Sequence, residues 1–253
     1  MASKTIYSRN EHQKRFVSLV ESLSPAHSYW QVWTDFVQMQ AACISNAVDP
    51  EHAERREELY MTLAKKYSGE ELNVFCEMAG EFLVAMQENP EQDFLGETFM
   101  MLQLGQGHVG QFFTPYHVSQ CMNAMVDIES DLLHAPWVTT VDPACGAGAL
   151  LVGRANDLRK RGINYQQRVL FIGQDVDTIA ALMCYLQISA IGCPGYVVIG
   201  DSLGEPLTSW DGNGLFPADN SNVWYTPMFF ESTWTGRRLI AMAKGGPRGA
   251  GSE

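Results

Sequence analysis

The chain has 253 residues, of which 46% are hydrophobic and 18% charged, a composition typical of a globular protein with a substantial buried core. It has no apolar run as long as a membrane span, no signal-peptide core and no Cys-x-x-Cys among its six cysteines, so we expect no membrane segment, no bound metal and a reducing cytoplasm as its compartment. The net charge of −12, from 17 basic and 29 acidic residues, argues against strong binding of the DNA backbone by this chain alone.

Residues 1–104 predict a succession of helices. Apolar residues recur at helical spacing within Glu11–Leu23 and again in the segments that follow. Asp49, which precedes a proline, predicts the N-cap of a charged helix over Glu51–Lys66. The segment Ser68–Glu71 has the sequence of a capping box, and a strongly amphipathic pattern follows it. These patterns indicate packed helix faces and no chemistry of their own.

The last helix of this region is expected to be capped by Asn89, and a glycine-rich segment follows it. We place a domain boundary in that segment, with a helical N-terminal domain over residues 1–104 and a second domain over residues 105–253 that ends in a flexible tail. At the start of the second domain, Thr114 is expected to cap a helix over His117–Val126.

The most informative segment runs from Val138 to Leu151. It opens with a β-branched run, which favours a buried strand, and turns through Asp142-Pro-Ala-Cys-Gly146-Ala-Gly148 before resuming as a helix. A strand that ends in a glycine turn and feeds a helix is the start of a nucleotide-binding βαβ unit. Taken alone, a Gly-x-Gly is weak evidence, because most glycine pairs lie in ordinary turns.

Further β-rich runs near residues 169–174, 196–200 and 222–226 alternate with helical patterns, which predicts an α/β fold with a parallel sheet. Asp175 and Asp201 follow the second and third strands. In such folds a carboxylate at the end of the second strand holds ribose hydroxyls. The alternative is that Asp175 is only a loop acid.

Gly-Gln-Phe-Phe-Thr-Pro at 110–115, followed by Asp-Pro-Ala-Cys-Gly-Ala-Gly at 142–148, resembles the adenine-N6 DNA methyltransferases of type I restriction-modification systems. The resemblance extends from about Asp93 to Phe230. It implies a Rossmann-like domain, S-adenosyl-L-methionine as the cofactor and DNA as the substrate. Because the chain is acidic, DNA would be held mainly by a partner subunit.

The same resemblance implies a cofactor site. The Phe-Thr-Pro segment would fold over the methionine end, the aspartate and glycines of the turn would hold the amino-acid end, Asp175 would bind the ribose, and Asp201 would accept a hydrogen bond from the adenine amine. The cofactor-binding residues that it implies are Phe113, Thr114, Pro115, Asp142, Ala144, Gly146, Gly148, Asp175, Val176 and Asp201.

The catalytic segment departs from the pattern of the resembled family. There the fourth strand ends in Asn or Asp, then Pro-Pro and an aromatic, because the polar side chain holds the target amine and the aromatic stacks on the flipped base. Here the corresponding residues are Thr226, Pro227, Met228 and Phe229. The aromatic is retained, but the amide and the second proline are not, which predicts a degenerate catalytic motif.

Three functions therefore stay open. The first is a cofactor-binding, methyltransferase-like protein with a degenerate motif, and the second is an active DNA adenine-N6 methyltransferase that works with a partner subunit. The third is a non-enzymatic interaction protein that acts on a restriction-modification system. The sequence provides four strands where the resembled family has seven, so we also expect an exposed sheet edge and a homo- or hetero-oligomer.

Overall fold

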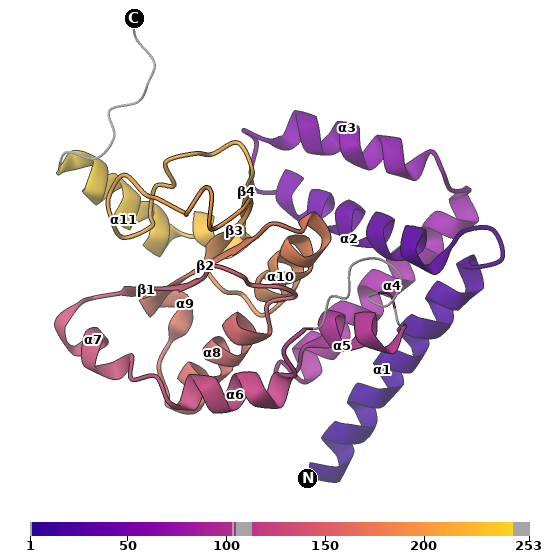
Figure 1. Cartoon of the computed structure of the whole chain (residues 1–253), viewed down its shortest axis with the longest axis horizontal. Helices are drawn as coiled ribbons and strands as arrows, with labels where there is room; N and C mark the ends of the chain where they lie inside the picture. Colours follow the sequence, from indigo (N-terminus) through magenta and orange to yellow (C-terminus); the bar gives the residue numbers. More distant parts are fainter. Residues whose placement is uncertain (1, 103, 105–112, 245–253) are drawn as a thin grey trace, which may run out of the picture.

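The computed structural model describes residues 2–102, 104 and 113–244. Five helices form the first part of the chain (Figure 1): α1 (Ala2–Leu23), α2 (Tyr29–Asn46), α3 (Ala53–Ala64), α4 (Gly69–Glu88) and α5 (Phe94–Met101). The prediction of helices through this region is confirmed over the described residues. The capping box is present as predicted, since the Ser68 hydroxyl accepts from the N–H of Glu71 and the Glu71 carboxylate accepts from the N–H of Ser68.

Three predicted helix starts are wrong. Helix α3 begins at Ala53 without a side-chain cap, because the Asp49 carboxylate is instead paired with the guanidinium of Arg56. Helix α5 begins later than expected, with Asp93 rather than Asn89 as its cap, since the Asp93 carboxylate accepts from the N–H of Gly96. Helix α6 (Tyr116–Ala124) has no side-chain cap, so Thr114 does not take that role.

The second part of the chain is an α/β unit, as predicted. Four strands form one sheet in the order β1-β2-β3-β4, and helices lie between and around them (Figure 1). The strands are β1 (Val138–Asp142), β2 (Val169–Asp175), β3 (Gly195–Ile199) and β4 (Val223–Tyr225). The remaining helices are α7 (Glu129–His134), α8 (Ala149–Lys160), α9 (Tyr165–Arg168), α10 (Thr178–Ala190), the 3-10 turn η1 (Pro227–Phe230) and α11 (Ser232–Ala243).

The prediction of an entirely parallel sheet is wrong at its last strand. Strands β1, β2 and β3 are parallel, but β4 runs antiparallel to β3, with Tyr196 opposite Tyr225. The reason lies in the connection over residues 200–222, which contains no helix to carry the chain back across the sheet. The chain therefore enters β4 at the edge where β3 ended.

Both faces of the sheet are buried at its second strand, β2. Alternate residues of β2 divide between two apolar clusters, since Phe171 packs into the large core with α8 and α10 while Ile172 packs into a smaller core on the other face. That smaller core contains Trp234 of α11 and Phe229 of η1. The middle of the sheet is thus a buried layer between helices, with the partly exposed β1 as one edge strand and β4 as the other.

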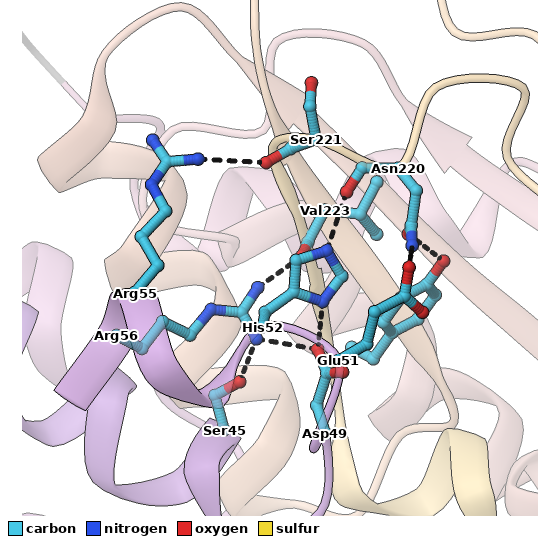
Figure 2. Close-up of polar contacts among 10 residues, drawn as sticks. Ser45, Asp49, Glu51, His52, Arg55, Arg56, Asn220, Ser221 and Val223 are labelled. Carbon is cyan, nitrogen blue, oxygen red and sulfur yellow. Dashed lines mark hydrogen bonds and ion pairs between the residues drawn. The ribbon is translucent and has the colours of Figure 1, made fainter.

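The helices of the first part are joined to the sheet by a buried polar cluster around Arg56 (Figure 2). Its guanidinium binds the Asp49 carboxylate at 2.7 Å and the carbonyl of Val223 at 2.5 Å, and it also contacts the Ser45 hydroxyl. The same group stacks 4.1 Å from the ring centre of Trp224. The domain boundary near residue 104 stays a prediction. Within the described ranges, no helix is both long and apolar enough to cross a membrane.

Candidate cofactor site and membership of a family

In the turn after β1 the backbone packs closely against Phe113 and against α10. Gly146 and Gly148 have φ angles of 51° and 95°, which lie in the left-handed region that favours glycine. A Cβ atom at Gly148 would lie 2.9 Å from the Cys184 sulfur, so any side chain there would clash with α10. Both glycines are therefore required by the shape of the turn, which ends where α8 begins.

Asp142 ends β1 with a buried carboxylate that is only half satisfied. Its Oδ1 accepts from the N–H of Ala144 at 3.2 Å, whereas Oδ2 is buried and accepts from none of the described residues. Burial raises the pKa of this carboxyl, the hydrogen bond from Ala144 opposes that effect, and the charge of Asp175 adds to it. A positively charged donor would satisfy Oδ2 and reverse the penalty of burial.

Asp175 ends β2 and holds the turn in place. Its Oδ2 accepts from the N–H of Gly146 at 2.8 Å, and its Oδ1 accepts from the N–H of Asp177 at 3.0 Å. Asp177 caps α10 by accepting from the N–H of Ala180. Val176 lies between the two aspartates and is 71% exposed.

Asp201 lies at the same edge of the sheet, just beyond β3. The N–H of Gly200 donates to the carbonyl of Asp175 at 2.9 Å, so the ends of β2 and β3 are adjacent. The Asp201 side chain is exposed, and its Oδ1 accepts from the N–H of Leu203. The structure thus brings Asp142, the glycine turn, Asp175 and Asp201 together at the carboxyl ends of the parallel strands, here called the carboxyl edge.

Phe113 lies against the turn. A Cβ atom at Gly146 would be 3.0 Å from Cδ1 of Phe113, so the ring covers that glycine. Thr114 and Pro115 follow and are exposed, as is Ala144 on the turn itself. The first half of the Gly-Gln-Phe-Phe-Thr-Pro segment, residues 110–112, lies outside the described residues.

The structure does not bring the predicted catalytic residues to this edge. Thr226 is buried at the other end of the strands, beside the first residue of β3. Its Oγ1 donates to the carbonyl of Cys193 at 2.7 Å and accepts from the N–H of Gly195 at 3.0 Å. Gly195 and Ile199 are the two ends of β3, which at about 3.3 Å per residue lie roughly 13 Å apart. The antiparallel direction of β4 produces this placement.

Pro227 and Phe229 form a packed corner at that other end of the strands. The Phe229 ring stacks on Tyr225 with centres 4.7 Å apart. The Arg238 guanidinium lies 4.1 Å from the Phe229 ring centre and donates a hydrogen bond to the Phe229 carbonyl. Phe229 is 4% exposed, so no free aromatic face is offered to a base. In this arrangement the segment stabilises the sheet corner.

Sequence reasoning missed Gln187 of α10. Its amide Nε2 donates to Asp93 Oδ1 and to the carbonyl of Ala147, each at 2.7 Å, and its Oε1 accepts from the N–H of Leu95 at 3.2 Å. The one signal in the sequence was a glutamine within a mostly apolar helical run, and the structure shows that side chain fully buried. Such a residue is retained only where its hydrogen bonds are made.

The chain is similar in sequence to a curated protein. It is 24% identical over 130 residues to the methylase subunit of the type I restriction enzyme MjaIX from Methanocaldococcus jannaschii, and the match covers 51% of this chain and 21% of that subunit. The chain therefore spans about a fifth of the length of this curated relative.

Two solved structures are similar at low sequence identity. One is a Listeria monocytogenes protein assigned as a class I S-adenosylmethionine-dependent methyltransferase, at 16% identity and a TM-score of 0.45, covering 94% of this chain and 79% of that one. The other is the methyltransferase subunit of a type I restriction-modification system from Streptococcus thermophilus, at 20% identity and a TM-score of 0.39, covering 75% of this chain and 40% of that one.

The match to a family is broader. Residues 93–240, more than half of the chain, match the family described as N-6 DNA Methylase. The matched region begins at the N-cap of α5 and includes the glycine turn, Asp175, Asp201 and the whole sheet. The chain belongs to the N-6 DNA Methylase family.

Proposed function

We propose that this chain binds S-adenosylmethionine at the carboxyl edge of β1, β2 and β3 and does not transfer the methyl group by itself. The observation that carries the proposal is the buried Oδ2 of Asp142, which lacks a donor among the described residues beside a turn that requires glycine. The ammonium group at the cofactor's amino-acid end is a positively charged donor, which would pair with this negatively charged carboxylate.

The other residues at this edge suit the remaining parts of the cofactor. Each carboxylate oxygen of Asp175 accepts one backbone N–H and keeps a further lone pair for a ribose hydroxyl. Asp201 would accept a hydrogen bond from the adenine, and the exposed Val176 would give it an apolar contact. Phe113 would cover the methionine end. When bound, the cofactor supplies an electrophilic methyl group.

The absence of turnover by the chain alone follows from the position of Thr226. A target amine must be held in line with the methyl group, and small misplacements cost large factors in rate. Thr226 is committed to hydrogen bonds at the other end of the strands, and Phe229 is buried there. We therefore assign the chain as a cofactor-binding component with a degenerate catalytic motif.

One observation favours the second function, methylation of adenine in DNA together with a companion subunit. Strand β1 is an edge strand that leads directly into Asp142, and its Val141 is 51% exposed. A companion chain that docks along β1 would bring its own residues beside the cofactor. It would also supply the DNA contacts that a chain with a net charge of −12 does not favour.

Calorimetry tests the first proposal. S-adenosylmethionine should bind the parent, and Asp142→Asn should weaken binding by roughly tenfold or more, since a charge-assisted hydrogen bond contributes about 1.5–3 kcal/mol. Asp131→Asn, an exposed aspartate on α7, is the matched control and should bind as the parent does. Lack of binding by the parent would leave the interaction-protein function in its place.

Methyl transfer to adenine-containing DNA separates the first two functions. The purified chain should give no product with cofactor present. Product that appears only on addition of a companion methylase subunit, and that Asp142→Asn abolishes, would establish the second function. Turnover by the purified chain alone would refute the assignment of a degenerate motif.

A further inference from the structure

Helix α5 reaches the glycine turn by a polar route. Its N-cap, Asp93, accepts a hydrogen bond from Gln187, and the same Gln187 amide group donates to the carbonyl of Ala147, which lies between the two glycines of the turn. Both donors of the amide are therefore used, and its oxygen accepts from Leu95 at the start of α5. One fully buried side chain thus joins α5, α10 and the turn.

Helix α5 also reaches the turn by an aromatic route. The Phe99 ring lies 5.1 Å from the Phe113 ring in an edge-to-face arrangement, and Phe113 in turn covers Gly146. The two routes end on neighbouring residues, Gly146 and Ala147. The turn that carries the cofactor proposal is consequently held from one side by a helix of the N-terminal region.

That helix is itself firmly packed. Phe94 is fully buried, with ring centres 5.5 Å from Phe16 of α1 and 5.6 Å from Phe82 of α4. The Thr98 hydroxyl donates to the Phe94 carbonyl and so is satisfied within the helix. The position of α5 is therefore determined by the helical region, and Gln187 transfers that position to the turn.

We infer that Gln187 is a positioning residue for the cofactor turn, and that the helical N-terminal region functions as the support from which the turn takes its place. The inference rests on the proposed binding of S-adenosylmethionine. Gln187 would touch no part of the cofactor. It would act by holding the Ala147 carbonyl, so that the flanking glycines keep the backbone path that a ligand's amino-acid end requires.

The substitution Gln187→Met tests the inference, because methionine fills a similar volume and makes none of the three hydrogen bonds. Gln92→Met is the matched control. Gln92 is also fully buried and directly precedes Asp93, but its amide donates to the carbonyls of Ala85 and Asn89 and not to the turn. Both variants lose a buried amide, so a general loss of stability should be similar in the two.

The measurement is the dissociation constant of two ligands by calorimetry. S-adenosylhomocysteine carries the amino-acid end that the turn would hold, whereas 5′-methylthioadenosine lacks it. Gln187→Met should weaken S-adenosylhomocysteine roughly tenfold or more and leave methylthioadenosine within about threefold of the parent, by analogy with other indirect positioning groups. Gln92→Met should change neither ligand selectively.

Equal binding of S-adenosylhomocysteine by the parent and by Gln187→Met would overturn the inference while leaving the proposed cofactor site intact. Equal weakening of both ligands would also overturn it, because that is the result of a merely structural role. Should Gln187→Met not fold, Gln187→Asn replaces it, since the shorter amide cannot span Asp93 and Ala147 and should show the same selective loss. Failure of the parent to bind either ligand would refute the proposed function itself.

Discussion

The N–H of Gly146 donates to Oδ2 of Asp175 across 2.8 Å, which ties the turn after β1 to the end of β2. The carboxylate expected to bind a ribose is therefore also a support of the backbone. Asp175→Ala should lower both the thermal stability and the affinity for S-adenosylmethionine, the latter by at least an order of magnitude, because each lost charge-assisted hydrogen bond contributes about 1.5–3 kcal/mol.

Calorimetry and thermal denaturation of the same preparation check this expectation. Asp177→Ala is the control, since it removes the cap of α10 without removing the acceptor of Gly146. An Asp175→Ala protein that binds the cofactor as tightly as the parent would show that this aspartate only supports the turn.

Asp142 predicts a pH dependence of the ligand-free protein. Burial raises the pKa of its carboxyl above the ordinary 3.8, so below 3.8 the group is protonated in the folded and unfolded states alike and its full contribution is present. As the pH rises through the higher folded pKa, the folded state loses that stability. Asp142→Asn does not titrate and should resist denaturant better than the parent at neutral pH.

Denaturant midpoints measured for parent and variant across this pH range give the answer. The advantage of Asp142→Asn should shrink toward zero as the pH falls to 3.8 and below. An advantage that stays constant with pH would mean that the carboxyl is not penalised by its burial.

Thr226 should behave as a structural residue. Thr226→Val keeps the shape but leaves the Cys193 carbonyl and the Gly195 N–H without their partner, at a cost of about 1–3 kcal/mol in the free energy of unfolding. Cofactor affinity should not change, because the residue lies at the other end of the strands. Thr226→Asn, which would restore the polar group of related catalytic motifs, should not create methyl transfer.

Chemical denaturation and calorimetry on Thr226→Val separate the two roles. Unchanged stability together with lost methyl transfer in the presence of a companion subunit would return Thr226 to the catalytic site.

Arg56 should contribute far more to stability than its neighbour Arg55. Removing one partner of a buried ion pair costs about 3–5 kcal/mol, and Arg56→Met takes away the guanidinium that pairs with the buried Asp49 carboxylate. Arg55 is exposed and makes one hydrogen bond, at 3.3 Å, to the Ser221 carbonyl (Figure 2). Arg55→Met should therefore stay within about 0.5 kcal/mol of the parent.

Equilibrium unfolding in urea measures both variants on one scale. Similar losses for the two arginines would show that the cluster around Arg56 does not join the helices to the sheet in solution.

The strands could be predicted from sequence because β-branched runs between helical patterns are a local signal, and all four appear within a residue or so of their expected bounds. The direction of β4 could not, since it depends on how residues 200–222 travel, and nothing periodic in that segment encodes its path. The catalytic role of Thr226 was predicted from its position in a motif. Because β4 is antiparallel to β3, Thr226 lies beside the first residue of β3 and not beside its last.

Side-chain partners were the other gap. Asp49 before a proline has the local signature of a helix cap, but a buried guanidinium seven residues away competes for it and prevails. Gln187 makes its hydrogen bonds to residues 40 and more positions away, so no window of sequence reveals them. The acids at the strand ends were found because that fold-level pattern depends on topology alone.

The cysteine packed against Gly148, Cys184, allows the rate at which the turn opens to be measured. Cys184 and its neighbour Cys145 are buried, and the hydrogen bond between the two thiols, followed by burial, raises the pKa of Cys184. A thiol reagent should modify the exposed cysteines at once and reach these two only when the turn opens. The exposed cysteines are Cys43, Cys76 and Cys121. With the third buried cysteine, Cys193, replaced by alanine, the slow phase of labelling reports how often the turn opens, without any ligand or catalytic assay.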